Sequence, residues 1–381
     1  MSTIPLDYET LRLIWWLLLG VLLIGFAIMG GRDLGVGALL PFAARTDEER
    51  RVLINIVGPT WEGNQVWLVV GGGSIFAAFP PLYAVSFSGL YLAMIVILLA
   101  LILRPVGFKF RSKIEDARWR TVWDWVLFVG GAVPALIFGV AMGNVLLGVP
   151  FHLDASMRVF YTGNFFQLLS PFALLAGLVS LGMIVTQGAA VIAARTDGAV
   201  AGRARTYGML AGGVTIGLFV LGGVWLTVMD GHVVTSAIDP HAPINPLGKT
   251  VELVRGGWLH NYARYPWMLA GPAIGIIGML GAVLALAARR RLVALLASSA
   301  GIFGITATAG LSLFPFLLPS SSMPAAGLTL WDATSSQLTL FIMLVVTAFF
   351  LPIIVLYTGW VFRVMRGPVS SESLNKNPNA Y

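Results

Sequence analysis

Nine stretches of mostly apolar residues, each long enough to cross a lipid bilayer, take up most of the 381 residues of this chain. A helix needs about 20 apolar residues for one crossing. The sequence therefore predicts an all-α, polytopic membrane protein with nine transmembrane helices and no sheet. The predicted cores of the spans are residues 14–31, 64–78, 83–103, 125–147, 165–194, 207–229, 266–288, 292–314 and 338–361.

The composition supports a membrane protein. Hydrophobic residues make up 57% and charged residues only 11% of the chain, whereas about a quarter of a soluble protein is charged. The positive residues behind the net charge of +7 lie in short loops between apolar stretches, which argues against a nucleic-acid partner. No cysteine is present, so disulfides, thiolate metal sites, cysteine-ligated haem and iron–sulfur clusters are excluded. No basic region precedes the first stretch, so we expect it to stay in the mature protein.

The loops differ in positive charge. Of the 24 Lys and Arg residues, 18 lie in the odd-numbered loops and the C-terminal tail. Because positive residues near span ends tend to stay in the cytoplasm, the N-terminus is predicted outside and the C-terminus inside. We expect one transmembrane domain over residues 1–366, with a long external loop at 230–265 that forms a cap, and a cytoplasmic tail at 367–381.

Two acidic side chains fall at membrane depth. Asp33 precedes Arg45 by 12 residues and Glu62 follows Arg51 by 11, which places them about 18 and 17 Å from the cytoplasmic turn at about 1.5 Å per residue. An ionisable group at such depth costs about 2.5–3.5 kcal/mol and usually faces a bundle interior or a water-filled route. Because a short loop makes these helices antiparallel neighbours, both carboxylates are expected to line one cavity open to the cytoplasm.

The amides of Asn64 and Gln65 would supply hydrogen bonds to water in that cavity. A proton or cation entry path is the functional hypothesis. There are structural alternatives. Arg32 and Asp33 would neutralise each other near an interface, and Glu62 would cap a helix that begins after a Gly-Pro break.

Haem, metal and hydrolytic chemistry have no visible residues. The four histidines all fall in predicted external loops, too far from the spans for good axial haem ligation. No phosphate loop, nucleophile elbow or zinc spacing occurs. We therefore expect no redox haem, no metal site and no catalytic residue in this chain. Residues 104–120 are dense in charge and predict a cytoplasmic ionic loop, typical of a lipid-headgroup or partner-docking surface.

Seven segments carry a family resemblance. They are Trp-Glu-Gly-Asn-Gln-Val-Trp at 61–67, Arg-Pro-Val-Gly-Phe at 104–108, Arg-Ser-Lys-Ile-Glu at 111–115, the segment 161–169, Phe-Pro-Phe at 314–316, Pro-Ser-Ser at 319–321 and Trp-Asp-Ala-Thr-Ser-Ser-Gln-Leu at 331–338. In this order they resemble subunit II of the cytochrome bd quinol oxidases, including their cyanide-insensitive branch. The resemblance covers nearly the whole chain.

The resemblance implies a bacterial inner-membrane subunit with two four-helix bundles and one peripheral helix, paired as a heterodimer with a larger subunit I. In the family, subunit I carries two b-type haems, haem d and the quinol site, and subunit II carries no redox haem. The complex oxidises quinol and reduces dioxygen to water with protons drawn from the cytoplasm. Small single-span accessory subunits, a structural quinone and membrane lipids are further partners that the resemblance implies.

The resemblance also bears on single residues. It implies a proton role for Glu62, where the family commonly has aspartate, and the start of a dioxygen route near Trp67. The family usually reads Asp-Gly-Phe-Asp-Leu/Met-Gly in the first span, whereas residues 30–35 read Gly-Gly-Arg-Asp-Leu-Gly here. One acid is lost and one base gained, so we predict an ion pair of Arg32 with Asp33 or Glu62.

Two other functions are compatible with the same residues. A proton-coupled secondary transporter would hold its substrate where Gly58 and Pro59 break a helix. A scaffold would support the haem subunit without conducting protons.

Overall fold

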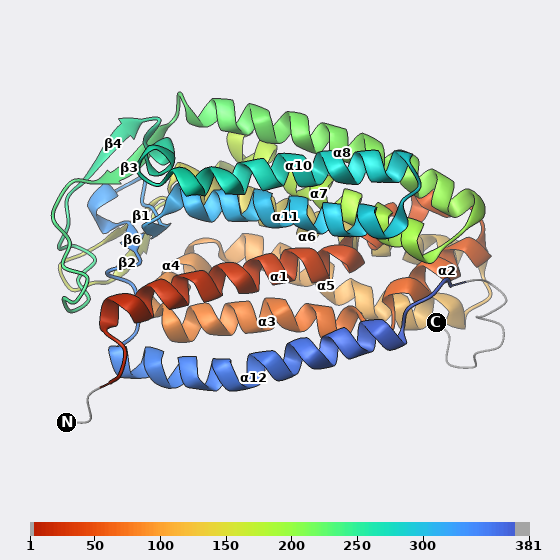
Figure 1. Ribbon diagram of the computed structural model, residues 1–381, viewed down its shortest axis with the longest axis horizontal. Helices are drawn as coiled ribbons and strands as arrows, with labels where there is room; N and C mark the ends of the chain where they lie inside the picture. Colours follow the sequence, from red (N-terminus) through yellow and green to blue (C-terminus); the bar gives the residue numbers. More distant parts are fainter. Residues whose placement is uncertain (1–3, 370–381) are drawn as a thin grey trace.

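Long helices that run side by side form the body of the protein. The computed structural model describes residues 4–369 (Figure 1). Within these residues, eight helices are long and apolar enough to cross a membrane, which confirms the prediction of a polytopic helical membrane protein. They are α1 (Tyr8–Ala43), α5 (Tyr91–Phe110), α6 (Ala117–Leu147), α7 (Pro171–Arg195), α8 (Gly198–Leu226), α10 (Ala270–Ala287), α11 (Arg291–Leu313) and α12 (Gln337–Val364).

The remaining predicted span corresponds to α3 (Trp61–Ala78). This helix follows the short α2 (Asp47–Val57) and a turn at Gly58–Thr60. Its first turn carries a carboxylate and two amides, so α3 is less apolar than the eight helices above. That α3 crosses the bilayer stays a prediction.

Two predicted spans are interrupted. The core predicted at 83–103 is divided between α4 (Pro80–Gly89) and α5, with Leu90 between them. The core predicted at 165–194 begins as the 3-10 helix η2 (Phe165–Leu169), and α7 starts only after it. Proline suits the first position of α7 because the first amides of a helix have no intrahelical acceptor.

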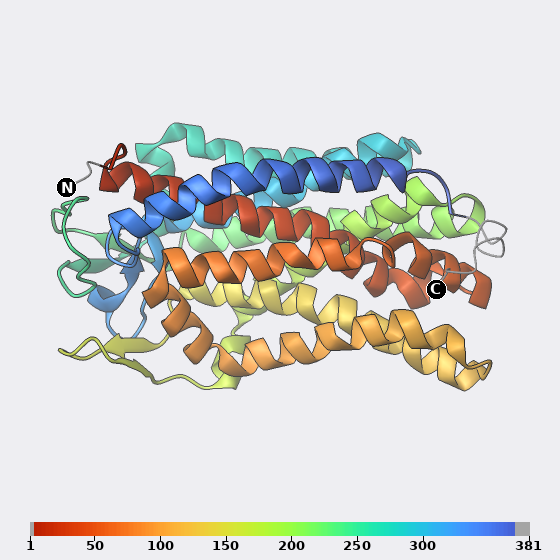
Figure 2. The ribbon, with the colours of Figure 1, turned by 90° about the horizontal axis from the view of Figure 1, so that it is seen from below.

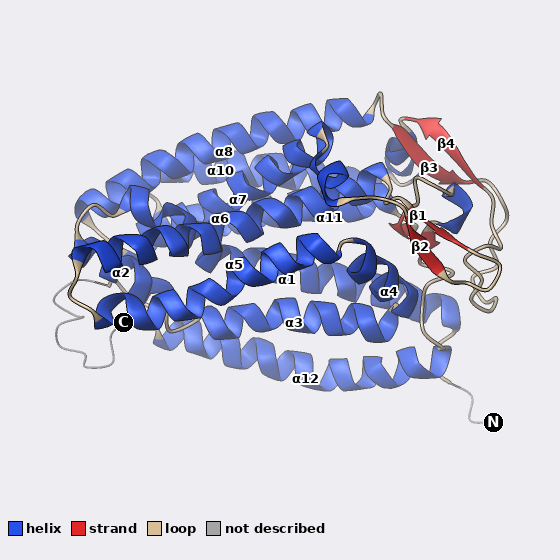
Figure 3. Ribbon diagram, turned by 180° about the vertical axis from the view of Figure 1, so that it is seen from behind, coloured by secondary structure: helices blue, strands red, loops and turns tan. Residues whose placement is uncertain are grey.

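The prediction of no sheet is wrong. In the described part of the chain, three small antiparallel sheets lie together at one end of the bundle (Figure 3), which we call the sheet end. Helix α2 marks the opposite end, which we call the α2 end (Figure 3). The strands have two to five residues, too few for a hydrophobic pattern to reveal them. They are β1 (Phe151–Leu153) with β2 (Val159–Tyr161), β3 (Asp230–Val234) with β4 (Val251–Arg255), and β5 (Phe316–Leu318) with β6 (Leu328–Thr329).

The loop at 230–265 is folded against the sheet end. It holds β3, β4, the 3-10 helix η3 (Gly257–Leu259) and the short α9 (His260–Arg264). Lys249 Nζ lies 2.7 Å from a carboxylate oxygen of Asp332, both largely buried. The buried Arg12 of α1 donates hydrogen bonds to the carbonyl oxygens of Pro240 and Ala242. These polar contacts attach the loop to α1 and to the segment before α12.

Helix α1 is the centre of the bundle and packs against α3, α6, α7 and α11. It approaches α7 closely because both helices have glycine at the crossing. A Cβ atom on Gly35 would lie 2.1 Å from the Ile184 carbonyl oxygen, and one on Gly188 would lie 2.2 Å from the Gly35 carbonyl carbon. Small residues at helix crossings are the usual means of packing in a membrane, where apolar burial between helices gains little.

Helix α12 lies at the edge of the bundle. In the two perpendicular views it runs along α1 and α3 (Figures 1 and 2), which it also contacts. Only 6% of its most apolar window is buried within this chain. Its apolar face is therefore free to contact lipid or another polypeptide.

Replacing Gly188 by Val should prevent the close crossing of α1 and α7. Overpacking of a tight contact costs about 1–3 kcal/mol, so the thermal unfolding temperature of the purified protein should fall clearly. Gly213→Val on α8 is the matched control, since a Cβ atom there meets nothing within 4 Å. Equal unfolding temperatures for the two variants would show that the crossing does not limit stability.

His232 provides a pH-dependent contact at the sheet end. Its Nε2 lies 2.8 Å from the Ser320 carbonyl oxygen, and its ring stacks on Trp258. Burial lowers the pKa of His232 from its ordinary value, although the hydrogen bond to Ser320 acts the other way. The folded chain therefore resists a proton that the unfolded chain accepts below a pH of about 6.5.

The free energy of unfolding should consequently fall on acidification, by up to about 1.4 kcal/mol per pH unit from this residue. Thermal unfolding measured from a pH of about 8 down to about 5 should show a shallower loss of stability in His232→Phe than in the wild type. If the unfolding temperatures of the two proteins fall in parallel with pH, His232 does not contribute to the loss of stability on acidification.

Candidate functional site

A cluster of one acid, one amide and one guanidinium lies inside the helix bundle. Asp33 of α1 is 2% exposed, and its Oδ2 accepts a hydrogen bond of 2.9 Å from Asn64 Nδ2 of α3. Nη2 of Arg104 on α5 lies 4.0 Å from the same oxygen. The predicted neighbours Asp33 and Asn64 therefore meet, at the contact of α1 with α3.

Arg104 was placed by its sequence in a cytoplasmic ionic loop, and that placement is wrong. It is 4% exposed within α5, which continues through Pro105 to Phe110. Gly130 of α6 makes room for the side chain, since a Cβ atom there would lie 2.7 Å from Arg104 Cγ. In the sequence, Gly130 in the next predicted span was the one signal of a buried Arg104, because a glycine inside a helix can make room for a large side chain of a neighbouring helix.

Two polar atoms of the cluster lack a hydrogen-bond partner among the described residues. They are Asp33 Oδ1 and Arg104 Nη2, both buried. Buried polar atoms are normally paired with protein or with ordered water, so exceptions call for an explanation. A separation of 4.0 Å between Nη2 and Oδ2 is too long for a direct hydrogen bond and suits a bridging water.

Glu62 and Asn64 lie on the same turn of α3 but face different ways. Asn64 is 2% exposed, whereas Glu62 lies exposed on the surface of this chain. Residues two apart on a helix do not share a face, so the contact of Asn64 with Asp33 turns Glu62 outward. No hydrogen bond or ion pair within residues 4–369 joins Glu62 to Asp33.

The other predicted residues of α3 line its flank. Gln65 and Trp67 are half-buried. The Trp67 ring packs against Gly25 of α1, where a Cβ atom would lie 2.5 Å from the ring. Trp67 therefore sits at the interface of α1 and α3, just under one turn beyond Asn64.

The predicted ion pair of Arg32 does not form. Among the described residues no carboxylate lies within 4.0 Å of its guanidinium, which instead lies 4.7 Å from the ring centroid of Phe362 on α12. Consecutive helical residues point in directions about 100° apart, so Asp33 faces inward while Arg32 faces α12. Arg104 is the guanidinium that faces Asp33.

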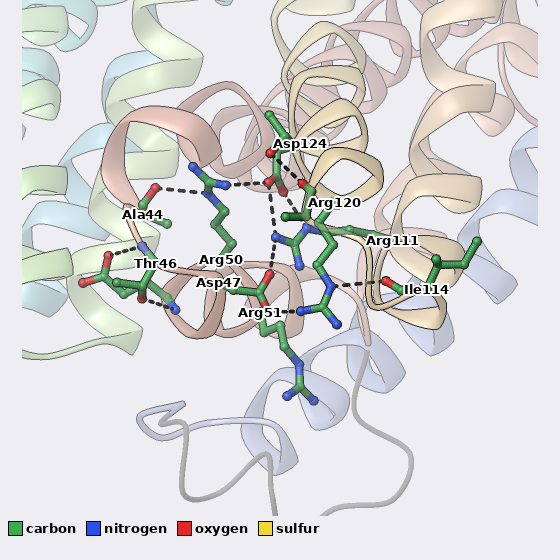
Figure 4. Close-up of polar contacts among 12 residues, drawn as sticks. Ala44, Thr46, Asp47, Arg50, Arg51, Arg111, Ile114, Arg120 and Asp124 are labelled. Carbon is green, nitrogen blue, oxygen red and sulfur yellow. Dashed lines mark hydrogen bonds and ion pairs between the residues drawn. The ribbon is translucent and has the colours of Figure 1, made fainter.

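The α2 end carries a second polar network (Figure 4). Asp124 contacts Arg50 at 2.9 Å and the fully buried Arg111 at 2.5 Å. Asp47 contacts Arg111 at 2.8 Å and Arg120 at 2.9 Å. These pairs join α2 to the 3-10 helix η1 (Arg111–Lys113) and to the first turns of α6, so part of the expected ionic loop is an internal contact and not a free surface.

Asp124→Asn should destabilise the protein because it leaves Arg111 buried with one acid in place of two. Breaking a buried pair costs about 3–5 kcal/mol, and we expect the lower figure since Asp47 still faces Arg111. Thermal unfolding is the measurement, with the exposed Glu115→Gln as a charge-matched control. If both variants unfold at the same temperature, the network does not hold the α2 end together.

Together these features define a polytopic helical membrane protein that keeps an acid, an amide and a guanidinium inside its bundle. The family described as cytochrome bd terminal oxidase subunit II matches residues 11–365. The chain is 50% identical over 376 residues to cytochrome bd-I ubiquinol oxidase subunit 2 of Escherichia coli strain K12, covering 98% of this chain and 99% of the relative. It is 48% identical over 375 residues to the probable cytochrome oxidase subunit 2 of Haemophilus influenzae strain KW20, with coverage of 98% and 99%.

A solved structure has the same fold. One chain of bd oxidase from Geobacillus thermodenitrificans superposes with a TM-score of 0.69 at 18% identity, covering 93% of this chain and 98% of that one. This chain belongs to the cytochrome bd terminal oxidase subunit II family. The family assignment made from sequence is confirmed, and the protein is a multi-pass inner-membrane subunit of a terminal oxidase. A proton-coupled transporter has no support from these similarities.

Proposed function

We propose that this chain is the non-haem subunit II of a quinol oxidase that reduces dioxygen to water, and that it takes up protons for this reaction from the cytoplasm. The observation that carries the proton role is the burial of Asp33 on a membrane-spanning helix with one oxygen unpaired among the described residues. Such a group is costly in a membrane and is usually retained for function. Relatives named ubiquinol oxidase subunit 2 support quinol as the reductant.

The proposed orientation places the α2 end in the cytoplasm. The loops at this end carry most of the arginines, as the positive-inside rule requires. We propose nine spans, including α3, arranged as two four-helix bundles with one peripheral helix in a single domain over residues 1–366. Of the proposed tail at 367–381, residues 370–381 lie outside the described part.

Protons would pass from the α2 end to the cluster around Asp33. Asn64 fixes one oxygen of Asp33, while the spacing to Arg104 suits a water that carries a proton between them. Gln65 would line the same path. Glu62, on the outer side of the same turn, would pass the proton to the partner subunit.

The partner would be the haem-bearing subunit I, with two b-type haems and haem d. We propose that it covers the exposed apolar faces of α3 and α12, where α12 is almost bare in the isolated chain. A dioxygen route would begin near Trp67 at the same surface. This chain would contribute at most a structural quinone and no redox haem.

Loss of either carboxylate should slow proton delivery. In the purified complex, Asp33→Asn and Glu62→Gln are expected to lower quinol-dependent oxygen uptake at least about tenfold, because an amide cannot release a proton near neutral pH. Glu62→Asp, which keeps a carboxylate, and Asp116→Asn, which removes an exposed one, are the matched controls. Both should stay within about twofold of the wild type.

An optical spectrum of each variant shows whether the haem subunit is still bound and intact. Normal haem absorption with slow oxygen uptake supports the proton role. Unchanged uptake and unchanged proton coupling in both amide variants would favour a scaffold, and a colourless preparation that lacks a haem-bearing partner would overturn the oxidase assignment.

A further inference from the structure

Four arginines surround one small pocket at the α2 end, between α7, α8, α10 and α11. Arg205 comes from α8, Arg289 and Arg290 from the turn after α10, and Arg291 from the start of α11. The space between these side chains is too narrow to hold a water molecule, so a phosphate would bind at its mouth, over the guanidinium groups. Its other walls include buried alanine side chains, so the polar lining is entirely cationic.

The positive charge in this pocket is largely uncompensated. Asp197 pairs with Arg291. Within residues 4–369, no carboxylate lies within 4.0 Å of Arg205, Arg289 or Arg290. Other arginines at the same end differ, since Arg203 lies 2.6 Å from Glu49.

The turn that presents two of these arginines is conformationally specific. Arg289 has φ of 57°, in the left-handed region where helix ends usually carry glycine. Backbone hydrogen bonds from Ala288 to Leu284 and from Arg290 to Ala285 close the turn. Arg289 thus occupies a position where glycine would fit with less strain. This backbone conformation orients the Arg289 side chain at the turn between α10 and α11.

Apolar side chains begin directly beside the arginines. Leu284 of α10 is 59% exposed, and Leu292 and Leu296 of α11 are 67% and 61% exposed. They lie within about two helical turns of the pocket and face away from the bundle. A ligand with a phosphate next to acyl chains fits this surface, whereas a free anion would contact only the arginines. Figure 1 shows that α8 and α10 lie on the other side of α1 from α12.

We propose that Arg205, Arg289 and Arg290 bind the phosphate of an anionic phospholipid, with its acyl chains along the exposed faces of α10 and α11. Basic pockets between membrane helices on the cytoplasmic side favour such headgroups. The site is separate from the cluster around Asp33, and it does not depend on proton conduction by this chain.

The test uses the whole complex, stripped of lipid in detergent and supplied with dioleoylphosphatidylglycerol, dioleoylphosphatidylcholine or inorganic phosphate. Native mass spectrometry counts the lipid that stays bound. The wild type should retain phosphatidylglycerol over phosphatidylcholine. The double variant Arg289→Gln/Arg290→Gln should bind phosphatidylglycerol about 25-fold more weakly, since one arginine near an anionic surface contributes about fivefold.

The matched control is Lys113→Gln/Arg118→Gln, which removes the same charge from exposed positions in η1 and the first turn of α6, at the same end of the protein. It should stay within about twofold of the wild type. The haem spectrum and the unfolding temperature in phosphatidylcholine show that both double variants are folded. These readouts also separate this proposal from the proton role, because oxygen uptake is not its measure.

Three results would overturn the proposal. Equal retention by the wild type and the Arg289/Arg290 variant would show that the pocket does not bind lipid. Equal losses in both double variants would show general attraction to a positive surface. Displacement of phosphatidylglycerol by millimolar inorganic phosphate would show a soluble-anion site instead.

Discussion

The close contact of α1 with its neighbours is the interaction on which the rest of the bundle depends. Helices in a membrane gain little from apolar burial against one another, so contact area and polar pairing hold them together. Gly35 and Gly188 let α1 and α7 meet backbone to backbone, and Gly131 of α6 lies equally near Leu34 and Ala38. With α1 held in the centre, Asp33 cannot reach solvent and must be matched by α3 and α5. The polar cluster is thus a consequence of the packing.

Much of this arrangement follows from the sequence, because hydrophobic length, loop charge and helical rise are simple quantities. They predicted a polytopic helical membrane protein, and eight of the predicted spans correspond to helices long and apolar enough to cross a membrane within the described residues, although several helix ends differ from the predicted bounds. They also placed Asp33 and Asn64 in one cavity. These quantities do not predict the direction in which a side chain points from its helix, and the predictions that depended on it were wrong. Arg32 and Asp33 are adjacent in sequence, and adjacency suggested an ion pair, but in a helix it sends the two side chains to different neighbours. Arg104 was misplaced because it begins a stretch dense in charge that suggested a loop, whereas α5 continues to Phe110. The strands of the sheet end were too short to leave a pattern.

The arginines at the α2 end divide into two groups that net charge does not distinguish. Arg50, Arg111, Arg120 and Arg203 pair with acids and join neighbouring segments. Arg205, Arg289 and Arg290 have no such acid within the described residues and lie beside exposed leucines. The positive charge from which the orientation was predicted therefore supplies both internal ion pairs and, under our proposal, a surface for anionic headgroups. Only the position of the acids separates the two uses, and that position is set by the fold.

The geometry of α3 explains how one helix can serve both the interior of this chain and a partner. Asn64 faces α1, where it donates a hydrogen bond to Asp33. Glu62 precedes Asn64 by two residues, so it points to the opposite, exposed side of α3. Under the proposed function, the path from Asp33 to subunit I leads from the Asn64 side of α3 to the Glu62 side, about half a turn around the helix. Glu62 is exposed in the isolated chain, and under the same proposal the partner that covers α3 would complete its environment. A carboxylate at this position can therefore respond to assembly of the complex, while Asp33 is already enclosed by α1, α3 and α5 before the partner binds.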